Sequence, residues 1–282
     1  MKLHKVTAAS AAVLALALTA TACGSDDKAD SGSAGSGGGG KITIGIKIDQ
    51  PGIGLKTPDG KYTGFDVDVA TYIAKELGYD AKDITFKETK SADRETAIER
   101  GDVKFIAASY SINDKRLAKV DFAGPYLLAH QDLLVRADET SIKSPADLNK
   151  KKLCSVTGST SATNVKEKLA PKAQLQEYGG YSECLTGLEN KVIDAVTTDD
   201  SILAGYASQE TAKGKFKLAG FKMSNENYGI GLKKGDADLK KKIDAALTKM
   251  VADGSWDKAV KANFGPAGYK NEPAPKIGNI VK

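Results

Sequence analysis

Two small hydroxyl side chains and one arginine lie close together in SYSINDKR, residues 109–116. Ser109 and Ser111 precede Arg116, and neither a helix nor a strand requires this combination of residues. The guanidinium of arginine is planar and permanently charged, and it can form two parallel hydrogen bonds with a carboxylate. Arg116 is therefore a candidate carboxylate ligand. The alternative is a surface arginine that pairs with Asp114, and the residues by themselves leave both interpretations open.

A second candidate anion site lies in TGSTS, residues 157–161. This segment stands between a predicted strand, residues 152–156, and a predicted helix, residues 162–169. The first N–H groups of a helix have no partners within the helix and attract anions. Thr160, with Ser159 beside it, would contact an anion there. An ordinary Ser/Thr cap of the helix is the alternative, and the two interpretations are compatible.

Few residues favour catalysis, a metal site or nucleic-acid binding. The histidines are His4 and His130, and the chain has no Gly-x-Ser-x-Gly elbow. A Ser/His/Asp site would have to use His130, so we expect a protein that is not an enzyme and has neither a metal nor a cofactor. The formal net charge is +5 at pH 7, with acids and bases interspersed, which does not favour a nucleic-acid partner.

The N-terminus has the pattern of an export signal. A basic start, a short apolar run and small residues lead to Cys23, so residues 1–22 are predicted to be a signal peptide. The apolar run is shorter than the roughly 20 residues of a membrane-spanning helix. A cysteine after small residues resembles a bacterial lipobox, which predicts lipidation of Cys23, and ordinary secretion is the alternative. Residues 23–40 are mostly Gly, Ser and Asp and are predicted to be a flexible tether.

Two further cysteines, Cys154 and Cys184, lie beyond the predicted lipidation site. An even pair in an exported chain predicts a disulfide. In the chain-entropy model, closing a loop of about 30 residues would stabilise the fold by roughly 3–4 kcal/mol. Two free buried thiols are the alternative.

Strand and helix patterns alternate from Lys41 to Gly265, which predicts a mostly parallel α/β fold. The segment after Gly265 contains three prolines, at positions 266, 273 and 275, and is predicted to be loose. The predicted strands are residues 41–48, 83–89, 103–110, 152–156, 174–178, 192–199 and 228–235. The predicted helices are residues 66–78, 92–101, 144–151, 162–169, 181–191, 200–209, 236–254 and 256–265.

Four motifs occur in an order and spacing that resemble a known family. They are GFDVDVATYIAKELG, SYSINDKRLAKVDFAGPY, DAVTTDDS and YGIGLKKG. Together they are similar to the polar amino-acid-binding proteins of ABC importers, solute-binding protein family 3. A narrower likeness, to the glutamate-binding lipoproteins of actinobacteria, rests on IDQPGIGLK, SADRETAIERG and the pair LCSVTGSTS and SECLTGLEN.

The resemblance implies a periplasmic-binding-protein-like fold of type II. In this fold two α/β lobes, joined by two crossover segments, enclose the ligand. Lobe 1 would comprise residues 41–128 and 228–265, and lobe 2 would comprise residues 131–224. Residues 266–282 would form a C-terminal tail. The crossovers would fall at LLAHQ and NENY, and both cysteines of the predicted disulfide would lie in lobe 2.

The resemblance also implies contacts with the α-groups of a bound amino acid. Arg116 would bind the α-carboxylate, together with the backbone of Ser109 and the hydroxyl of Ser111. From the other lobe, Thr160 would offer its N–H and hydroxyl to the same carboxylate, with Ser159 adjacent.

Asp199, in DAVTTDDS, matches the position that binds the ligand ammonium in this family. A buried ammonium requires a partner of opposite charge. The alternative is that Asp199 or Asp200 only caps the helix that follows. We assign the cap to Asp200 and the ligand contact to Asp199.

Specificity would be set by a side-chain pocket in lobe 1. In related glutamate and aspartate binders, a Ser-x-x-Arg motif holds the side-chain carboxylate, and Ser91 and Arg94 in SADR match it. The two side chains would share a face if this segment is helical, and the alternative is an exposed arginine paired with a neighbouring acid. Lys47 falls at another pocket position. Tyr110 would pack on the aliphatic part of the ligand or belong to the core.

The function implied by the resemblance is transport without catalysis. The chain would be a monomeric, lipid-anchored protein on the outer face of the membrane of a Gram-positive bacterium. It would bind L-glutamate or aspartate and deliver it to the permease subunits of an ABC importer. The alternatives are a binding protein for another polar amino acid such as glutamine, a sensor, and an enzymatic variant of the fold.

Overall fold

The structure is a computed structural model that describes residues 40–282 of the chain. The predicted signal peptide, Cys23 and all but the last residue of the predicted tether lie outside the described residues. Within residues 40–282, the helices are too short or too polar to cross a bilayer.

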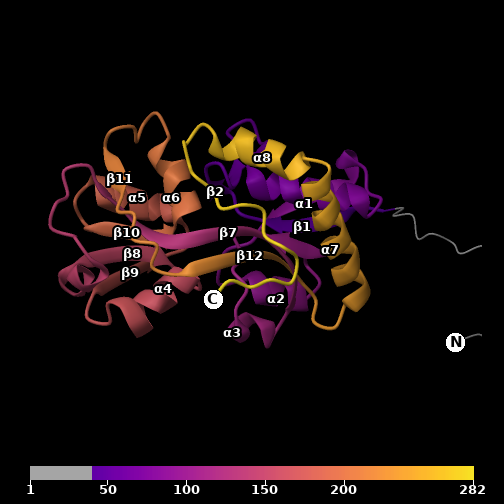
Figure 1. The fold of residues 1–282 in the computed structure, drawn as a ribbon, viewed down its shortest axis with the longest axis horizontal. Helices are drawn as coiled ribbons and strands as arrows, with labels where there is room; N and C mark the ends of the chain where they lie inside the picture. Colours follow the sequence, from indigo (N-terminus) through magenta and orange to yellow (C-terminus); the bar gives the residue numbers. More distant parts are fainter. Residues whose placement is uncertain (1–39) are drawn as a thin grey trace, which may run out of the picture. The chain divides into compact units, whose positions relative to one another are not determined.

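Strands and helices alternate along the described chain, as the sequence pattern predicts (Figure 1). The strands are β1 Ile42–Ile46, β2 Asp49–Gln50, β3 Gly54–Lys56, β4 Tyr62–Thr63, β5 Ile84–Glu88, β6 Phe105–Ala107, β7 Asp121–Arg136, β8 Lys152–Val156, β9 Gln174–Tyr178, β10 Ala195–Asp199, β11 Phe216–Leu218 and β12 Asn225–Leu232. The α-helices are α1 Phe65–Glu76, α2 Arg94–Glu99, α3 Asp114–Leu117, α4 Thr160–Asn164, α5 Tyr181–Glu189, α6 Asp200–Ala207, α7 Ala237–Ala252 and α8 Ser255–Phe264. Shorter turns are the 3₁₀ helices η1 Ala81–Asp83 and η2 Pro145–Lys150 and the π-helical turn η3 Val165–Leu169.

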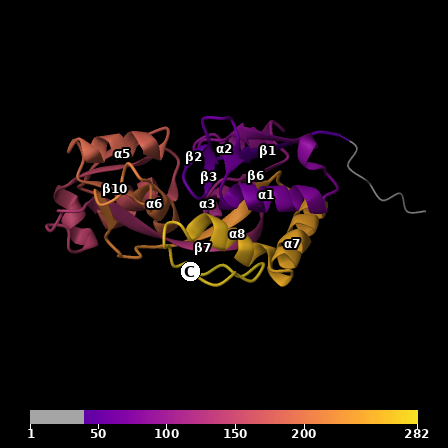
Figure 2. The same cartoon turned by 90° about the horizontal axis from the view of Figure 1, so that it is seen from above.

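The first half of the fold, which we call lobe 1, is built on strands in the order β5-β1-β6-β12-β7. Strand β1 runs parallel to both β5 and β6, and β12 runs antiparallel to β6 and β7. Helices α1, α7 and α8 lie on one side of this sheet, and α2 and α3 lie on the other (Figures 1 and 2). Each face carries its own buried apolar cluster, so the sheet is the centre of the lobe 1 core.

The second half, which we call lobe 2, is built on strands in the order β7-β10-β8-β9, with β11 beside β7. Strands β10, β8 and β9 are parallel, whereas β7 and β11 are antiparallel to their neighbours. Helices α5 and α6 cover one face and α4 covers the other (Figure 1). The disulfide between Cys154 and Cys184 joins β8 to α5 inside this lobe, as predicted.

Strand β7 belongs to both sheets and connects the lobes. Its N-terminal part pairs with β12 as far as the register Asn225 opposite His130. From Gln131, opposite Asp199, the strand pairs with β10 instead. Since β12 runs back beside β7, two antiparallel strands link the lobes (Figure 1). This arrangement explains how one chain forms two lobes that are joined by a pair of strands.

The prediction of a loose C-terminal segment is wrong. Tyr269 packs its ring against Phe264, and its hydroxyl donates to Asp200 Oδ1 at 2.8 Å. Glu272 Oε1 lies 3.0 Å from His130 Nε2, and the N–H of Val281 donates to the side chain of a strand β12 asparagine. The segment crosses the linking strands (Figure 1). Proline removes N–H groups from the backbone, but these side-chain and apolar contacts hold the segment against both lobes.

The segment that leads into SYSINDKR also differs from its prediction. The strand predicted for residues 103–110 ends at Ala107, since Ser109 has a left-handed backbone with φ 43°. The N–H of Ser109 donates to Asp66 Oδ2 at 2.7 Å rather than to a neighbouring strand. Burial raises the pKa of Asp66 to about 6, and this N–H is one of the hydrogen bonds that oppose the rise. The turn directs the rest of SYSINDKR toward the gap between the lobes.

Candidate functional site

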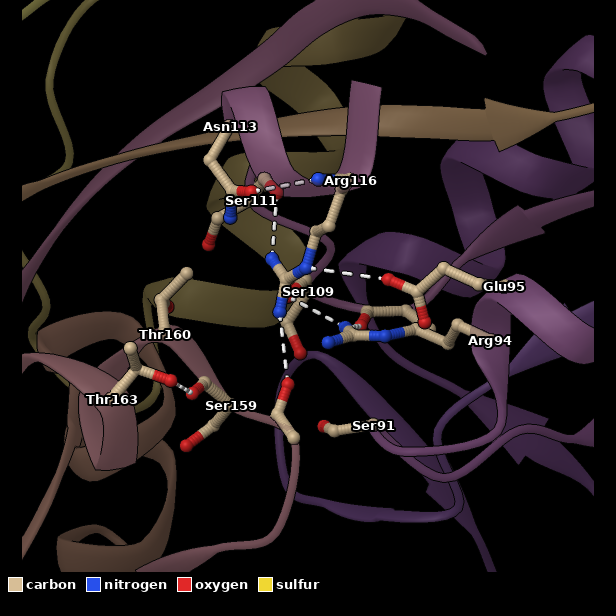
Figure 3. A network of polar contacts seen from close by, with 12 residues as sticks. Ser91, Arg94, Glu95, Ser109, Ser111, Asn113, Arg116, Ser159, Thr160 and Thr163 are labelled. Atoms are coloured by element: carbon tan, nitrogen blue, oxygen red, sulfur yellow. Dashed lines mark hydrogen bonds and ion pairs between the residues drawn. The ribbon is translucent and has the colours of Figure 1, made fainter. Parts of the chain in front are cut away.

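A small cavity between the lobes is lined by most of the predicted site residues. Lobe 1 contributes Ser91, Arg94, Ser109 and Arg116. Lobe 2 contributes Ser159, Thr160 and Asp199. Figure 3 shows the side chains of Arg116 and Arg94 pointing toward the loop that carries Ser159 and Thr160.

Arg116 is the central cation of this cavity, and its side chain is buried. Its Nη1 donates to the carbonyl oxygen of Ser111 at 2.6 Å, and its Nη2 donates to that of Gly158 in lobe 2 at 3.0 Å (Figure 3). Its Nε lies 3.6 Å from Glu95 Oε1. The alternative of a surface arginine paired with Asp114 is therefore wrong, because Arg116 turns inward.

The short helix α3 positions Arg116. Asn113 occupies the N-cap position, and its side-chain oxygen accepts the N–H of Arg116 at 3.0 Å. Asparagine is among the best N-cap residues, because its side chain satisfies an N–H that the helix leaves unpaired. The cap fixes the start of the helix, and Arg116 lies in its first turn.

Arg94 is only 2% exposed and has no acidic partner within salt-bridge distance among the described residues. Its Nη1 donates to the carbonyl oxygens of Ala108 at 3.0 Å and Ser109 at 3.3 Å, whereas its buried Nε has no partner. The guanidinium lies 4.1 Å from the centre of the Tyr110 ring. Burial, and secondly the charge of Arg116, lower the pKa of Arg94 to about 10.

Lys47 and Ser91 lie beside this arginine. Lys47 Nζ donates to Ser91 Oγ at 2.8 Å, and the lysine lines a neighbouring hollow with Asp49 and Glu88 rather than the cavity itself. Burial, and then the charge of Arg94, lower the pKa of Lys47 to about 7. Residues 91–93 form a turn before α2, so the helical face predicted for SADR is not present, although Ser91 and Arg94 still line the same cavity.

Tyr110 and Ser111 lie behind the arginines and do not line the cavity. The Tyr110 ring packs on Phe122 with ring centres 4.6 Å apart, and it lies beneath the guanidinium groups of Arg94 and Arg116. Ser111 contributes its carbonyl oxygen to Arg116. Tyr110 and Ser111 thus hold the two guanidinium groups in place from behind.

Asp199 faces the cations from lobe 2 and is buried. Its Oδ2 accepts a hydrogen bond from the Tyr228 hydroxyl, and its Oδ1 is buried without a partner. Burial, and secondly the nearby charge of Glu226, raise the pKa of Asp199 well above its usual value. An unpaired carboxylate oxygen of this kind is suited to an ammonium donor.

The predicted cap of α6, Asp200, is instead the first residue of the helix, and its carboxylate binds one N–H of the first turn. Asp199 occupies the N-cap position, but its side chain makes no cap hydrogen bond. Asp200 Oδ1 accepts the N–H of Ser201 at 2.8 Å and that of His130 at 3.0 Å. The Asp199 carboxylate is therefore not used by the helix.

Ser159 and Thr160 have separate partners at the start of α4. Ser159 Oγ accepts the N–H of Ala162 at 3.0 Å, so the ordinary cap is present. The Thr160 hydroxyl donates to Glu226 Oε2 at 2.8 Å. Its single hydrogen is thus used within the protein, and the oxygen keeps only acceptor capacity toward a ligand.

Sequence reasoning missed three residues that bear on this site. Glu226 on β12 is buried beside Thr160 and accepts a second hydrogen bond from Ser224 Oγ at 2.7 Å. Tyr228 holds Asp199, and Glu95 faces Arg116. Glu226 lies between two asparagines in the predicted crossover NENY, so the local pattern does not single it out. Nothing in the local pattern distinguishes Glu95 from an exposed helix residue.

The cavity pairs fixed cations of lobe 1 with a carboxylate of lobe 2. His130 Nε2 pairs with Glu272 in the C-terminal segment and does not line the cavity. Within the described part of the chain, no cluster of His, Cys, Asp and Glu side chains could hold a metal ion. The arrangement is suited to binding a molecule that carries both signs of charge.

Comparison with known proteins agrees with this geometry. The profile of the bacterial extracellular solute-binding proteins, family 3, matches residues 42–266. The glutamate-binding protein GluB of Corynebacterium efficiens is 48% identical over 234 residues, which cover 79% of this chain and 79% of that protein. The ABC transporter glutamine-binding protein GlnH of Bacillus subtilis is 41% identical over 223 residues, 78% of this chain and 80% of that protein.

A solved structure has the same fold. An ancestral arginine-binding protein bound to arginine superimposes with a TM-score of 0.75 at 35% identity, covering 80% of this chain and 99% of that one. The two-lobed type II fold that the motifs predicted is thereby confirmed. The chain belongs to the bacterial extracellular solute-binding proteins, family 3.

Proposed function

We propose that this protein binds L-glutamate between its lobes and delivers it to the permease of an ABC importer. The proposal includes a lipid anchor at Cys23, which would keep the monomeric protein at the outer face of the cell membrane of a Gram-positive bacterium. The two bodies that close on the ligand would be residues 41–128 with 228–265 and residues 131–224. Strands β7 and β12 would bend between them.

We choose glutamate because the side chain of Arg94 is buried and has no carboxylate partner. A fully buried guanidinium without a carboxylate partner is unfavourable, because burial removes the water that stabilises its charge. A ligand carboxylate would supply the missing partner and could use the free Nε. Lys47, hydrogen-bonded to Ser91, adds positive charge on the same side.

The remaining groups of glutamate have matching partners in the cavity. The α-carboxylate would lie against Arg116, and the ammonium would donate to the unpaired Oδ1 of Asp199. Ser91 lines the same space, and its hydroxyl, which accepts from Lys47, keeps a hydrogen that could be donated to a ligand carboxylate. Because Arg116 and Asp199 belong to different lobes, a ligand that contacts both would favour the closed arrangement.

The names of the two relatives support either glutamate or glutamine as the ligand of this protein. GluB is named as a glutamate-binding protein and GlnH as a glutamine-binding protein. A neutral amide would not compensate the charge of Arg94, and this difference is why glutamate is favoured here. The placement of His130 outside the cavity supports a role in transport without catalysis.

Isothermal titration calorimetry with glutamate, aspartate, glutamine and arginine tests this function. We expect glutamate to bind with micromolar or better affinity, which corresponds to about −8 kcal/mol. Glutamine should bind at least about 10-fold more weakly. If none of the four amino acids binds, or if arginine binds most tightly, the proposal is wrong.

A further inference from the structure

The segment Asp49–Pro51 of lobe 1 contacts helices α5 and α6 of lobe 2. In both ribbon views, β2 lies between the body of lobe 1 and helices α5 and α6 (Figures 1 and 2). Asp49 Oδ2 accepts the N–H of Tyr181, the first residue of α5, at 2.9 Å. The Tyr206 hydroxyl, on α6, donates to the Asp49 carbonyl oxygen.

Helix α5 has no side-chain cap within its own lobe. Its N-cap residue is Gly180, which has no side chain to accept an N–H. The carboxylate of Asp49 therefore serves as a cap supplied by the other lobe. A capping carboxylate satisfies an unpaired N–H and also complements the positive end of the helix dipole. The contact exists only when the two lobes are together.

Two glycines of lobe 2 allow this approach. A Cβ at Gly180 would lie 2.6 Å from Asp49 Oδ2, closer than side chains can approach. A Cβ at Gly205, within α6, would lie 2.0 Å from the carbonyl oxygen of Pro51. All three of the atoms nearest to that Cβ belong to Pro51, so nothing in lobe 2 itself requires glycine there.

The same segment is connected to the cavity through its middle residue. Gln50 is fully buried, and its Oε1 accepts the hydroxyl hydrogen of Ser109 at 3.1 Å. Ser109 lines the cavity and also accepts Arg94 through its carbonyl oxygen. One short segment thus contacts the receiving helices of lobe 2 on one side and the binding residues of lobe 1 on the other.

We propose that Asp49–Pro51 is a closing latch, which stabilises the closed arrangement of the lobes without touching the ligand. This inference rests on the proposed function, since it concerns the same closure. A contact that favours the closed state equally for every ligand raises the affinity for all of them by one common factor. The latch therefore sets affinity and leaves the choice among amino acids to the cavity.

The decisive variant is Gly205→Ala, which blocks the latch without changing any charge. Alanine is a better helix former than glycine, so the variant should keep or raise the melting temperature of the ligand-free protein. We expect the dissociation constants of all amino acids that bind to rise by the same factor, about 10-fold. Gly180→Ala should act in the same direction, because φ of −145° at that position suits alanine.

The matched control is Gly187→Ala on α5. Its Cβ would lie 3.5 Å from the nearest atom, on Ile193, which is an ordinary contact within lobe 2. Its affinities should stay within about 2-fold of wild type. The latch is wrong if Gly205→Ala also stays within that range, or if it weakens one amino acid and spares another.

A second measurement separates the failure of the latch from the failure of the proposed function. If the wild-type protein binds no amino acid, the function is wrong and small-angle X-ray scattering decides the latch. A larger radius of gyration for Gly205→Ala than for Gly187→Ala supports the latch. Identical scattering of these two variants overturns it.

Discussion

The guanidinium of Arg116 in lobe 1 donates to the carbonyl oxygen of Gly158 in lobe 2 across 3.0 Å. The loop can approach this closely because Gly158 has φ of +78° and a Cβ there would lie 2.8 Å from the backbone of Ala92. The main candidate for carboxylate binding is thus also a direct bond between the lobes. Binding and closure depend on the same side chain.

Replacing Arg116 by alanine should abolish the binding of every amino acid that the wild type binds. The substitution removes the partner of the α-carboxylate, which all amino acids share, and the bond to lobe 2 with it. Truncating one member of a buried charge pair weakens binding by about 2–5 kcal/mol, or at least about 30-fold. Calorimetry measures the loss, and Lys115→Ala, on the exposed side of α3, is the control. A loss of less than about 30-fold for any amino acid that the wild type binds would contradict the role of Arg116.

Glutamate binding should take up a proton above neutral pH, owing to Lys47. The pKa of this lysine is lowered to about 7, chiefly by burial and then by Arg94, so at pH 8 it is mostly neutral. The other groups that act on it are Asp49, Glu88 and Arg116. A second carboxylate nearby would raise its pKa again, so affinity for glutamate should fall as pH rises above 7.

Calorimetry at pH 8 in two buffers of different ionisation enthalpy measures this uptake. Glutamate should take up a fraction of a proton, glutamine should take up less, and Lys47→Met should remove the difference. Equal proton uptake for glutamate in the wild type and in Lys47→Met would show that another group titrates.

Loss of the Cys154–Cys184 disulfide should destabilise lobe 2. The bond joins α5 to β8, and its removal gives the unfolded chain more freedom, which lowers the free energy of unfolding by about 2–4 kcal/mol. Thermal melting with and without a reducing agent measures the effect. The double variant Cys154→Ser/Cys184→Ser should melt like the reduced wild type and should not respond to the agent. Identical melting of oxidised and reduced wild type would refute the structural role of the bond.

Much of the lobe architecture could be predicted from local pattern. The helix from Asp66 to Gly78 and the strand that leads to Asp199 were visible, because buried apolar residues recur with the period of each element. The disulfide was predicted only from the even number of remaining cysteines and from the predicted export signal. Arg116 was a candidate by residue type, but only the family resemblance favoured ligand binding over a surface pair with Asp114.

The details of the site depended on contacts between distant residues, which local pattern does not contain. The hydrogen bond from the Thr160 hydroxyl to Glu226 joins residues far apart in the chain. The hydrogen bond from the first N–H of α5 to Asp49 does the same. Residues 266–282 were misjudged for the same reason. Their prolines exclude helix and strand, but the ordering comes from partners on both lobes, such as His130.

The central claim is that Arg94 selects a side-chain carboxylate, and Arg94→Ala tests it most directly. Calorimetry of this variant with glutamate and with glutamine gives two dissociation constants, and Arg100→Ala, an exposed arginine that follows the same helix, is the control. We expect the affinity for glutamate to fall by at least about 30-fold, while that for glutamine is unchanged or improved. Equal losses for the two ligands would contradict the claim.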